Sequence, residues 1–399
     1  RLRAGFVCAE VALSVLLVIG AGLLVRSFLA VQRVQLGFQP AGVLSLRLSL
    51  PRARYPRTSD LAAFHEALAA RLSSVPGVAA VASANVVPMN NYLATTTIRL
   101  PGFEAQAPAA WPDVHYRMVS AGYFDVLGIA VLSGRAFDDF DRRGAMPVAI
   151  VSRGLARTYW PAGNAVGSRI EVRDDTEKSR AVEIVGIVDD VRHLGPEVAS
   201  PSEIYVPLPQ VPDATSIWLA NNMYVAVRTP QDPLSLAGAV RGEVARVDPE
   251  VAASFVRSME QWVGLSVQAR RFNLGVIGVF ALTALLLAAT GVYGVAAEAV
   301  AVRTRELGVR AALGASGPQL RLGVMKDGLA PVAGGIVLGV VFAAASSGLL
   351  ASFLYGVEGR DPATYAGVVA LAAAAGALGL YLPSRRVTRI DPVIALRTE

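Results

Sequence analysis

The chain has 399 residues, 53% of them hydrophobic, and a mean hydropathy of +0.47, which excludes an ordinary soluble protein and fits a chain with both membrane and soluble parts. Its net charge of +6 comes almost entirely from arginine, since Lys178 and Lys326 are the only lysines. Much of the positive charge lies beside the apolar segments, a placement that argues against a nucleic-acid partner.

Four apolar segments follow one another in a 1+3 arrangement. The first, at residues 6–25, is interrupted only by Glu10, and the other three, at 272–297, 328–357 and 362–384, carry no charge. A bilayer core about 30 Å thick needs roughly 20 apolar helical residues. We therefore predict an α-helical membrane protein with an α+β domain between its first and second spans. The expected helices lie at 1–30 and at about 272–299, 328–355 and 362–384.

The N-terminal span allows two interpretations. Arg1 and Arg3 ahead of an apolar run are compatible with a cleaved signal peptide, but the run is longer than a usual signal sequence. We expect a retained helix. The sequence does not begin with Met, which is expected of a fragment or of one half of a longer polypeptide.

Two features inside the predicted spans suggest contacts between helices. Glu10 is costly in a membrane unless its carboxylate reaches the interface or another helix, and both outcomes stay open. Gly335 and Gly339 form a small-xxx-small pattern that lets helices approach closely, within the chain or at a subunit interface.

The region 31–265 has the mixture of polar and apolar residues that is typical of a folded soluble domain. Strict alternation at 44–50 predicts a half-buried strand, and an amphipathic helix and a second strand follow it. The same strand, helix, strand order recurs near the end of the region. We predict two halves of one split βαβ subdomain, at about 43–87 and 220–257, with a strand-rich subdomain inserted at 88–212.

The predicted insertion contains five candidate strands, at 114–119, 148–152, 169–172, 182–188 and 203–206. Ser152 is expected to cap a short helix that ends near Tyr159. Ser258 is expected to cap a helix that continues through Arg270 into the second span as a stalk.

Motifs for catalysis are missing from the sequence. There is no Walker A, HExxH, CxxC or GxSxG pattern, so we predict no catalytic residues, no metal and no cofactor in this chain. Asp189, Asp190 and His193 follow a predicted strand, where a solvated turn is the simpler interpretation and a metal site the alternative. Cys8 is the only cysteine, so no disulfide forms within the chain.

Charge placement predicts the orientation. Arg1 and Arg3 precede the first span, and further arginines lie in the segment between the second and third spans and in the tail after the fourth. The positive-inside rule then places both termini and a loop at 300–327 in the cytoplasm, and the region 31–265 outside it.

The segment RTRELGVRAALGA at 303–315 is short and amphipathic and ends at a glycine. It fits either a basic stretch lying on anionic lipid or a docking surface for a cytoplasmic partner.

This segment strongly resembles the motif after the second span of FtsX-like ABC permeases, the group with a MacB-type periplasmic core domain. Other parts of the chain carry the same resemblance: GYF at 122–124, LSGR at 132–135, GIVDDVR at 186–192, IYVPL at 204–208 and the tail at 381–399. AEVALS at 9–14 and GLLVRSF at 22–28 are similar to the middle of duplicated permeases found notably in acidobacteria, which would make the chain a C-terminal half.

The resemblance implies a function and a set of residues. It implies a permease subunit at the bacterial inner membrane, with 31–265 as a periplasmic core domain and 266–399 as a permease domain. A separate ATPase subunit would bind ATP and couple to movement of the periplasmic domain, for export, lipoprotein release or envelope signalling. The coupling residues would be Arg303, Thr304, Arg305, Glu306, Leu307, Gly308, Arg310, Leu313 and Gly314.

Further partners follow from the same resemblance. They are a second permease unit, in a homodimer or pseudo-dimer, membrane lipid, and periplasmic or outer-membrane components. The alternative is an ATP-independent, membrane-anchored binding or scaffold protein.

Overall fold

The computed structural model describes residues 2–90, 92–100, 111–173, 178–213, 223–302, 306, 309–310, 313, 316–351 and 354–387. The chain divides into two compact units. The bundle unit consists of Arg1–Arg33 and Ala269–Glu399, and the sheet unit is Val34–Gln268.

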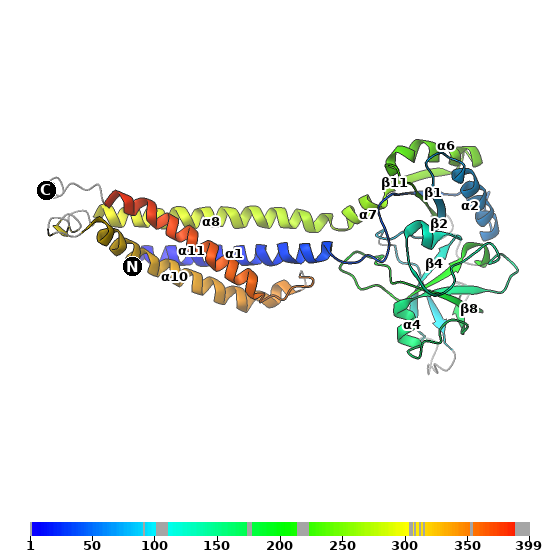
Figure 1. The fold of residues 1–399 in the computed structure, drawn as a ribbon, viewed down its shortest axis with the longest axis horizontal. Coiled ribbons are helices and arrows are strands. Elements are labelled where there is room, and N and C mark those ends of the chain that lie inside the picture. The colour runs from blue at the N-terminus through cyan, green and yellow to red at the C-terminus, as the bar shows by residue number, and fades with distance from the viewer. Residues whose placement is uncertain are drawn as a thin grey trace. The chain divides into compact units, whose positions relative to one another are not determined.

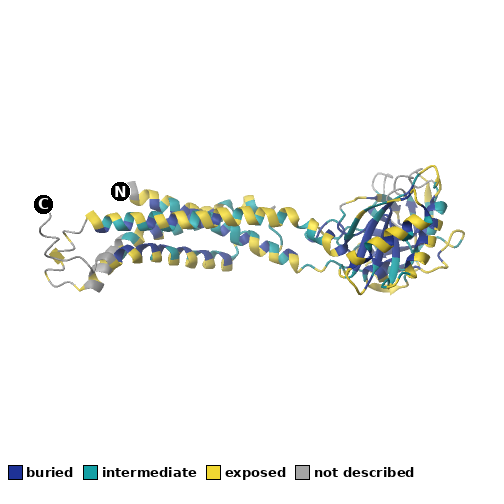
Figure 2. Cartoon of the chain, turned by 90° about the horizontal axis from the view of Figure 1, so that it is seen from above, coloured by how far each residue is buried: buried dark blue, intermediate teal, exposed yellow. Residues whose placement is uncertain are grey.

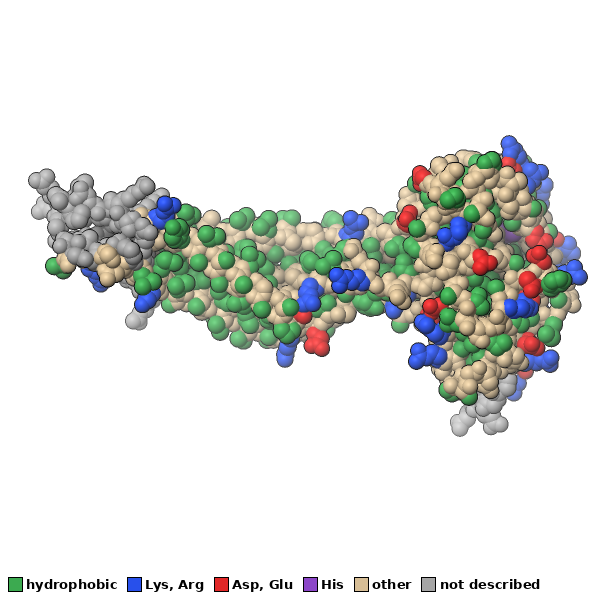
Figure 3. Space-filling model, in the orientation of Figure 1, with side chains coloured by type: hydrophobic (Ala, Val, Ile, Leu, Met, Phe, Trp, Pro, Cys, Tyr) green, Lys and Arg blue, Asp and Glu red, His purple; other side chains and the backbone are tan. Residues whose placement is uncertain are grey.

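The bundle unit is built from four long helices, α1 (Leu2–Gln32), α8 (Gln268–Val302), α10 (Gly317–Leu350) and α11 (Pro362–Val387). Each is long and apolar enough to cross a membrane. Apolar side chains cover the visible face of this unit (Figure 3). The prediction of four membrane helices in a 1+3 order is confirmed.

Two helix boundaries differ from the prediction. α10 begins at Gly317 rather than near 328, because Ser316 and Gln319 form a capping box that starts the helix before its apolar part. The predicted loop 300–327 is therefore shorter. The predicted stalk is not one helix, since α7 (Met259–Ser266) ends before Val267, which lies in a turn, and α8 begins at Gln268.

The two ends of the sheet unit's sequence together form the predicted split βαβ subdomain. Its halves are β1 (Val43–Ser49), α2 (Thr58–Ser73) and β2 (Ala80–Ala84), then β10 (Met223–Arg228), α6 (Ala237–Val247) and β11 (Ala252–Ser258). The strands lie in the antiparallel order β11-β1-β10-β2, so each half inserts a strand into the other. The helices α2 and α6 lie near each other beside this sheet (Figure 1).

Side chains of β1 alternate between the two faces of the sheet, and each face packs against helices. Leu44, Leu46 and Leu48 are fully buried in one apolar cluster with residues of α2 and α6. Ser45 points the other way and accepts a hydrogen bond from the indole of Trp262 on α7, 2.8 Å away. Buried residues follow the strands through the sheet unit (Figure 2).

The inserted subdomain closes on itself. Its strand pairings run β4-β3-β7-β8-β6-β9, and β9 returns to pair in parallel with β4. Six strands therefore form a ring around a buried apolar core, with β5 paired to β8 outside it. The strands are β3 (Thr95–Arg99), β4 (Asp113–Val119), β5 (Val131–Gly134), β6 (Val148–Ser152), β7 (Arg169–Arg173), β8 (Ser179–Val188) and β9 (Glu203–Pro207).

The described part of the sheet unit contains four further short helices. They are α3 (Tyr123–Leu127), α4 (Arg153–Tyr159) and the 3-10 turns η2 (Leu208–Gln210) and η3 (Pro233–Leu236). Ser152 caps α4 by accepting from Leu155 N, and Ser258 caps α7 together with Gln261, as predicted. The strands β3 and β5 and the helix α3 were not predicted.

Candidate functional site

The proposed coupling segment lies partly outside the described residues, which leave out Arg303, Thr304, Arg305, Leu307, Gly308 and Gly314. Of the others, Arg310 donates from Nη2 to Glu306 Oε1 over 2.6 Å, one helical turn away. Both of these side chains are exposed, and Leu313 is 83% exposed.

Gly335 and Gly339 lie against α1 of the same chain. A Cβ added to Gly335 would lie 2.6 Å from the carbonyl oxygen of Cys8, and one added to Gly339 would lie 2.7 Å from that of Ala12. Real side chains do not approach a backbone so closely, so both positions require glycine for α1 and α10 to meet. The face that they share is therefore occupied within the chain.

Glu10 points at another helix of the bundle. A Cβ added to Gly291 on α8 would overlap with Glu10 Oε2, so the carboxylate rests against glycine backbone. One turn on, the hydroxyl of Ser14 donates to the carbonyl of Ala284, also on α8, over 2.8 Å. Of the two outcomes left open by the sequence, the structure has Glu10 in contact with a neighbouring helix.

The opposite end of α1 is tied to the other helices by polar contacts. The hydroxyl oxygen of Ser27 accepts from Arg270 Nη1 at 3.2 Å and from the backbone N–H of Tyr355 at 2.8 Å. Arg26 forms an ion pair with Asp361, which also accepts from the backbone of Thr364 at the start of α11. These contacts connect α1 to α8, to the residues after α10 and to α11.

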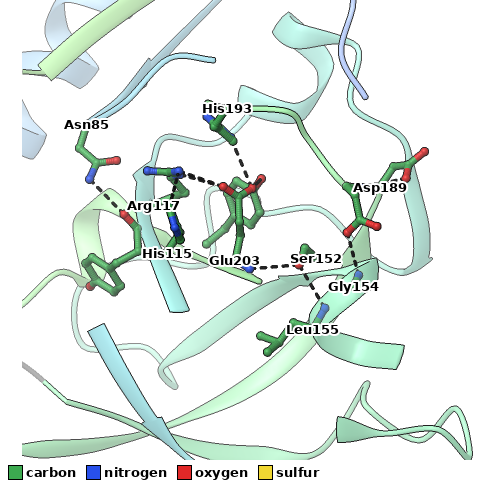
Figure 4. Close-up of polar contacts among 12 residues, drawn as sticks. Asn85, His115, Arg117, Ser152, Gly154, Leu155, Asp189, His193 and Glu203 are labelled. Atoms are coloured by element: carbon green, nitrogen blue, oxygen red, sulfur yellow. Dashed lines mark hydrogen bonds and ion pairs between the residues drawn. The ribbon is translucent and has the colours of Figure 1, made fainter. Parts of the chain in front are cut away.

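A buried charged cluster lies on the outer side of the ring, where β4 and β9 pair (Figure 4). Arg117 donates to Glu203 Oε1 from Nε at 3.2 Å and from Nη2 at 2.9 Å, and both side chains are fully buried. Tyr205 donates to Glu203 Oε2 at 2.6 Å. Arg117 Nη2 also lies 3.1 Å from His115 Nδ1. Sequence reasoning missed this cluster, although a charged residue inside each of two predicted strands was a signal.

Electrostatics keep the carboxylate of this cluster ionised. Burial raises the pKa of Glu203, but His193 and Arg117 beside it and the Tyr205 hydroxyl lower it to about 2. Burial lowers the pKa of His193 itself, although the Glu203 carboxylate beside it acts in the opposite direction. Arg117 Nη1 has no hydrogen-bond partner among the described residues.

The turn with Asp189, Asp190 and His193 does not assemble a metal site. Asp190 accepts from the backbone of Gly154 at 2.7 Å, and Arg153 pairs with both aspartates. His193 is buried and faces Glu203, its Nε2 3.4 Å from Oε2. No group of three metal-ligating side chains occurs among the residues that the structure describes. The solvated-turn interpretation is also wrong for His193, which lies in the core.

We expect the sheet unit to lose stability as the pH falls from about 6.5 to 4. Burial lowers the pKa of His65 to about 4, so in this range the unfolded chain binds a proton that the folded chain refuses. The loss from this residue is on the order of 3 kcal/mol. Tryptophan fluorescence in urea measures it, because all four tryptophans lie within Val34–Gln268.

His65→Asn is the matched variant for that measurement. It removes the titrating ring and should flatten the dependence on pH between 6.5 and 4. Equal slopes in the two proteins would assign the loss to other groups.

Comparison with known proteins identifies both regions of the chain. Residues 11–243 match the MacB-like periplasmic core domain, and residues 278–392 match the FtsX-like permease C-terminal domain. The permease YknZ of Bacillus subtilis is 23% identical over 288 residues, which are 72% of this chain and 70% of YknZ. MacB of Rhodospirillum rubrum is 36% identical over 131 residues, 31% of this chain and 19% of that protein.

Other relatives and solved structures are more distant. The export protein PvdT of Pseudomonas savastanoi pv. phaseolicola is 24% identical, over 67% of this chain and 40% of its own length. The periplasmic region of MacB from Actinobacillus actinomycetemcomitans is 10% identical with a TM-score of 0.38, covering 58% of this chain and 94% of that one. The extracellular domain of YknZ is 20% identical with a TM-score of 0.32, covering 51% and 91%.

Four membrane helices, with a large α+β unit between the first and second, define a multi-pass membrane protein with an extramembrane domain. The matched domains define it further. The chain belongs to the MacB/FtsX-type family of ABC transporter permeases. Permeases of this family work with an ATPase subunit. Membership of the family therefore does not favour the alternative of an ATP-independent scaffold protein.

Proposed function

We propose that this permease carries movement from a cytoplasmic ATPase to its periplasmic domain. The observation that supports this most is α8, one unbroken helix of 35 residues. It begins at the last residue of the sheet unit and ends at Val302, directly before the proposed coupling segment. At about 1.5 Å per residue it is longer than a bilayer core. A rigid rod between the two ends is what such transmission requires.

The proposal includes an orientation. The arginines next to the spans favour both termini and the segment 303–315 on the cytoplasmic side of the bacterial inner membrane. The sheet unit then lies in the periplasm. ATP would bind to the partner subunit.

A second permease unit is the other proposed partner, in a homodimer or pseudo-dimer. Only 11% of the apolar window of α8 is buried within the chain, against 44% for α1. Phe280 and Leu286 on α8 are 62% and 58% exposed. This free apolar face suits a second unit or lipid.

The cargo is proposed only as a class. The names of the relatives concern macrolide and pyoverdine export, and the chain spans only 19% and 40% of the two proteins described above that carry those names. Export, lipoprotein release and envelope signalling all use the same transmitted movement. Periplasmic or outer-membrane components are further proposed partners.

Replacing Glu306 and Arg310 by alanine tests the proposal. We expect association with the ABC ATPase to weaken about tenfold, as on removal of an interface hot spot. Their exposed ion pair contributes only about 0.3–0.5 kcal/mol to the helix, so folding should not change. Co-purification and ATPase activity in reconstituted vesicles are the measurements.

The matched control changes one acid and one arginine in the other short connection, Glu358→Gln with Arg360→Gln. This variant should keep full association. Unchanged association in the first variant would assign docking to another segment. If no ATPase co-purifies with the unaltered protein, the result favours the alternative of an ATP-independent scaffold protein.

A further inference from the structure

The strand β11 forms an edge of the sheet in the split βαβ subdomain. Among the described strands it pairs only with β1, so the backbone N–H and C=O groups on its other side meet no described strand. Its residues 252–257 are all exposed or half-buried. An open edge of this kind is a template to which one more extended segment can add through main-chain hydrogen bonds.

A bulge in β11 turns an aromatic side chain outward at this edge. Between the pairs Ser45–Arg257 and Arg47–Ser254, two residues of β11 oppose a single residue of β1. Phe255, one of the two, has a φ of +49°, a conformation that phenylalanine rarely adopts, and its side chain is 43% exposed. Strained residues of this kind are concentrated at functional sites.

The ring of Phe255 belongs to a stack of arginine and aromatic side chains. The guanidinium carbon of Arg47 lies 4.3 Å from the centre of that ring, and that of Arg257 lies 5.4 Å from it. Arg257 also lies 4.9 Å from the ring of Trp262, on the face of the sheet opposite α2 and α6. Stacking on aromatic rings holds both guanidinium groups in fixed orientations.

The two stacked arginines have no carboxylate partner among the described residues. Other arginines of the same subdomain do have one, since Arg54 pairs with Asp248 and Arg71 with Glu243. A carboxylate on a neighbouring strand is the natural partner of an oriented guanidinium group, because opposite charges attract across a pair of strands.

A second copy of this strand is a poor occupant of the edge. Two β11 strands side by side would bring arginines of like charge to the same face, which is unfavourable between neighbouring strands. A bulge and positive charges at an edge are also the features that prevent such self-association. The same arginines attract an acidic strand, so the charge selects one kind of partner and rejects the other.

We infer that the free edge of β11 binds an extended, acidic segment of a partner protein by adding it to the sheet. Its backbone pairs with β11, and the carboxylates at every second position lie on the face that carries Arg257 and Arg47. Its apolar atoms lie against Phe255. Binding at this edge requires neither nucleotide nor an ATPase, so it is measured without them.

The experiment uses the full chain in nanodiscs of zwitterionic lipid. The probe is the capped peptide Thr-Glu-Val-Glu-Val-Glu-Val-Thr with a neutral fluorophore, followed by fluorescence polarisation with empty nanodiscs subtracted. The matched probe has lysine in place of each glutamate. We expect saturable binding of the acidic peptide and none of the basic one. Equal binding of the two, or no saturable binding of the acidic peptide, would overturn the proposal.

Two further peptides separate strand addition from simple charge attraction. One has N-methyl groups on its glutamates and the other on its valines, so each lacks the N–H donors of one edge of the extended peptide. We expect one of them to bind like the parent and the other about tenfold more weakly or less, because roughly two backbone hydrogen bonds are lost. Full binding of both would contradict strand addition.

Variants of the chain locate the site. Arg47→Gln with Arg257→Gln should weaken binding of the acidic peptide about tenfold and reduce its dependence on salt, because two oriented charges are lost. Phe255→Gly should weaken binding about three- to tenfold through loss of the ring. Glycine adopts a positive φ without strain, so this variant should remain folded.

The control variant is Arg157→Gln with Arg241→Gln, which removes two exposed arginines that lie on α4 and α6. It should bind the peptide like the unaltered chain. Binding that falls equally in this control would point to general charge attraction, and binding unchanged by Arg47→Gln with Arg257→Gln would place the peptide elsewhere. Either result contradicts the assigned edge, and urea unfolding followed by tryptophan fluorescence confirms that each variant is folded.

Discussion

Replacing Arg117 by methionine is expected to destabilise the sheet unit by about 3–5 kcal/mol, because it leaves the Glu203 carboxylate buried without its countercharge. Both side chains are fully buried, and the arginine supplies two of the three hydrogen bonds that this carboxylate receives from the described residues. The pKa of Glu203 is about 2, so the carboxylate stays ionised at neutral pH. Urea denaturation followed by tryptophan fluorescence measures the change.

Two controls separate the buried charge from the loss of an arginine. Arg169→Met removes another arginine from a strand of the ring. The Arg169 side chain is 71% exposed, and its Nε lies 3.8 Å from Glu183 Oε2. This substitution should cost at most about 1 kcal/mol. Arg117→Met combined with Glu203→Gln should be less destabilised than Arg117→Met alone, because no buried charge is left. Strictly additive effects of the two changes would contradict this account.

Replacing Gly335 and Gly339 together by leucine is expected to separate α10 from α1. Both new side chains would start less than 3 Å from backbone oxygens of α1, and backbone cannot move aside as a flexible side chain can. Overpacking costs about 1–3 kcal/mol at each site, so roughly 2–6 kcal/mol together.

Cys8 provides the measurement for this variant. It is the only cysteine, and a Cβ added to Gly334 would lie 3.4 Å from its sulfur. The rate of maleimide labelling of Cys8 should rise when the two helices separate. Gly348→Leu is the control, since a Cβ there meets nothing within 4 Å among the described residues. An unchanged labelling rate in the double variant would show that α1 and α10 tolerate the extra volume.

Elements with a strong hydrophobic period can be predicted from the amino-acid sequence. The leucines at every second position of β1 and the apolar positions along α2 indicate both the type of each element and its buried face. Ser152 and Ser258 are identifiable as helix caps because capping depends on a few adjacent residues. The proposed coupling segment is recognisable through its resemblance to a family motif, and most of it lies outside the described residues.

Elements without such a period were missed. β3 reads TTTIR and β5 reads VLSG with all four residues exposed, so neither shows the alternation of a half-buried strand. They are strands because β4, β7 and β8 offer them hydrogen bonds. Such pairing depends on neighbours that are distant in sequence.

The sequence by itself determined the four spans, the interruption of the first by an α+β domain, and the split of that domain into two βαβ halves. These follow from hydropathy and local periodicity, which act over one helix or strand. Only the tertiary structure decided that β9 closes the ring on β4, that Arg117 and Glu203 meet in a fully buried pair, and that His65 is buried beside the hydroxyl of Ser83. The reason is physical: the burial and electrostatic environment of a charged or polar group are set by segments far away in the chain.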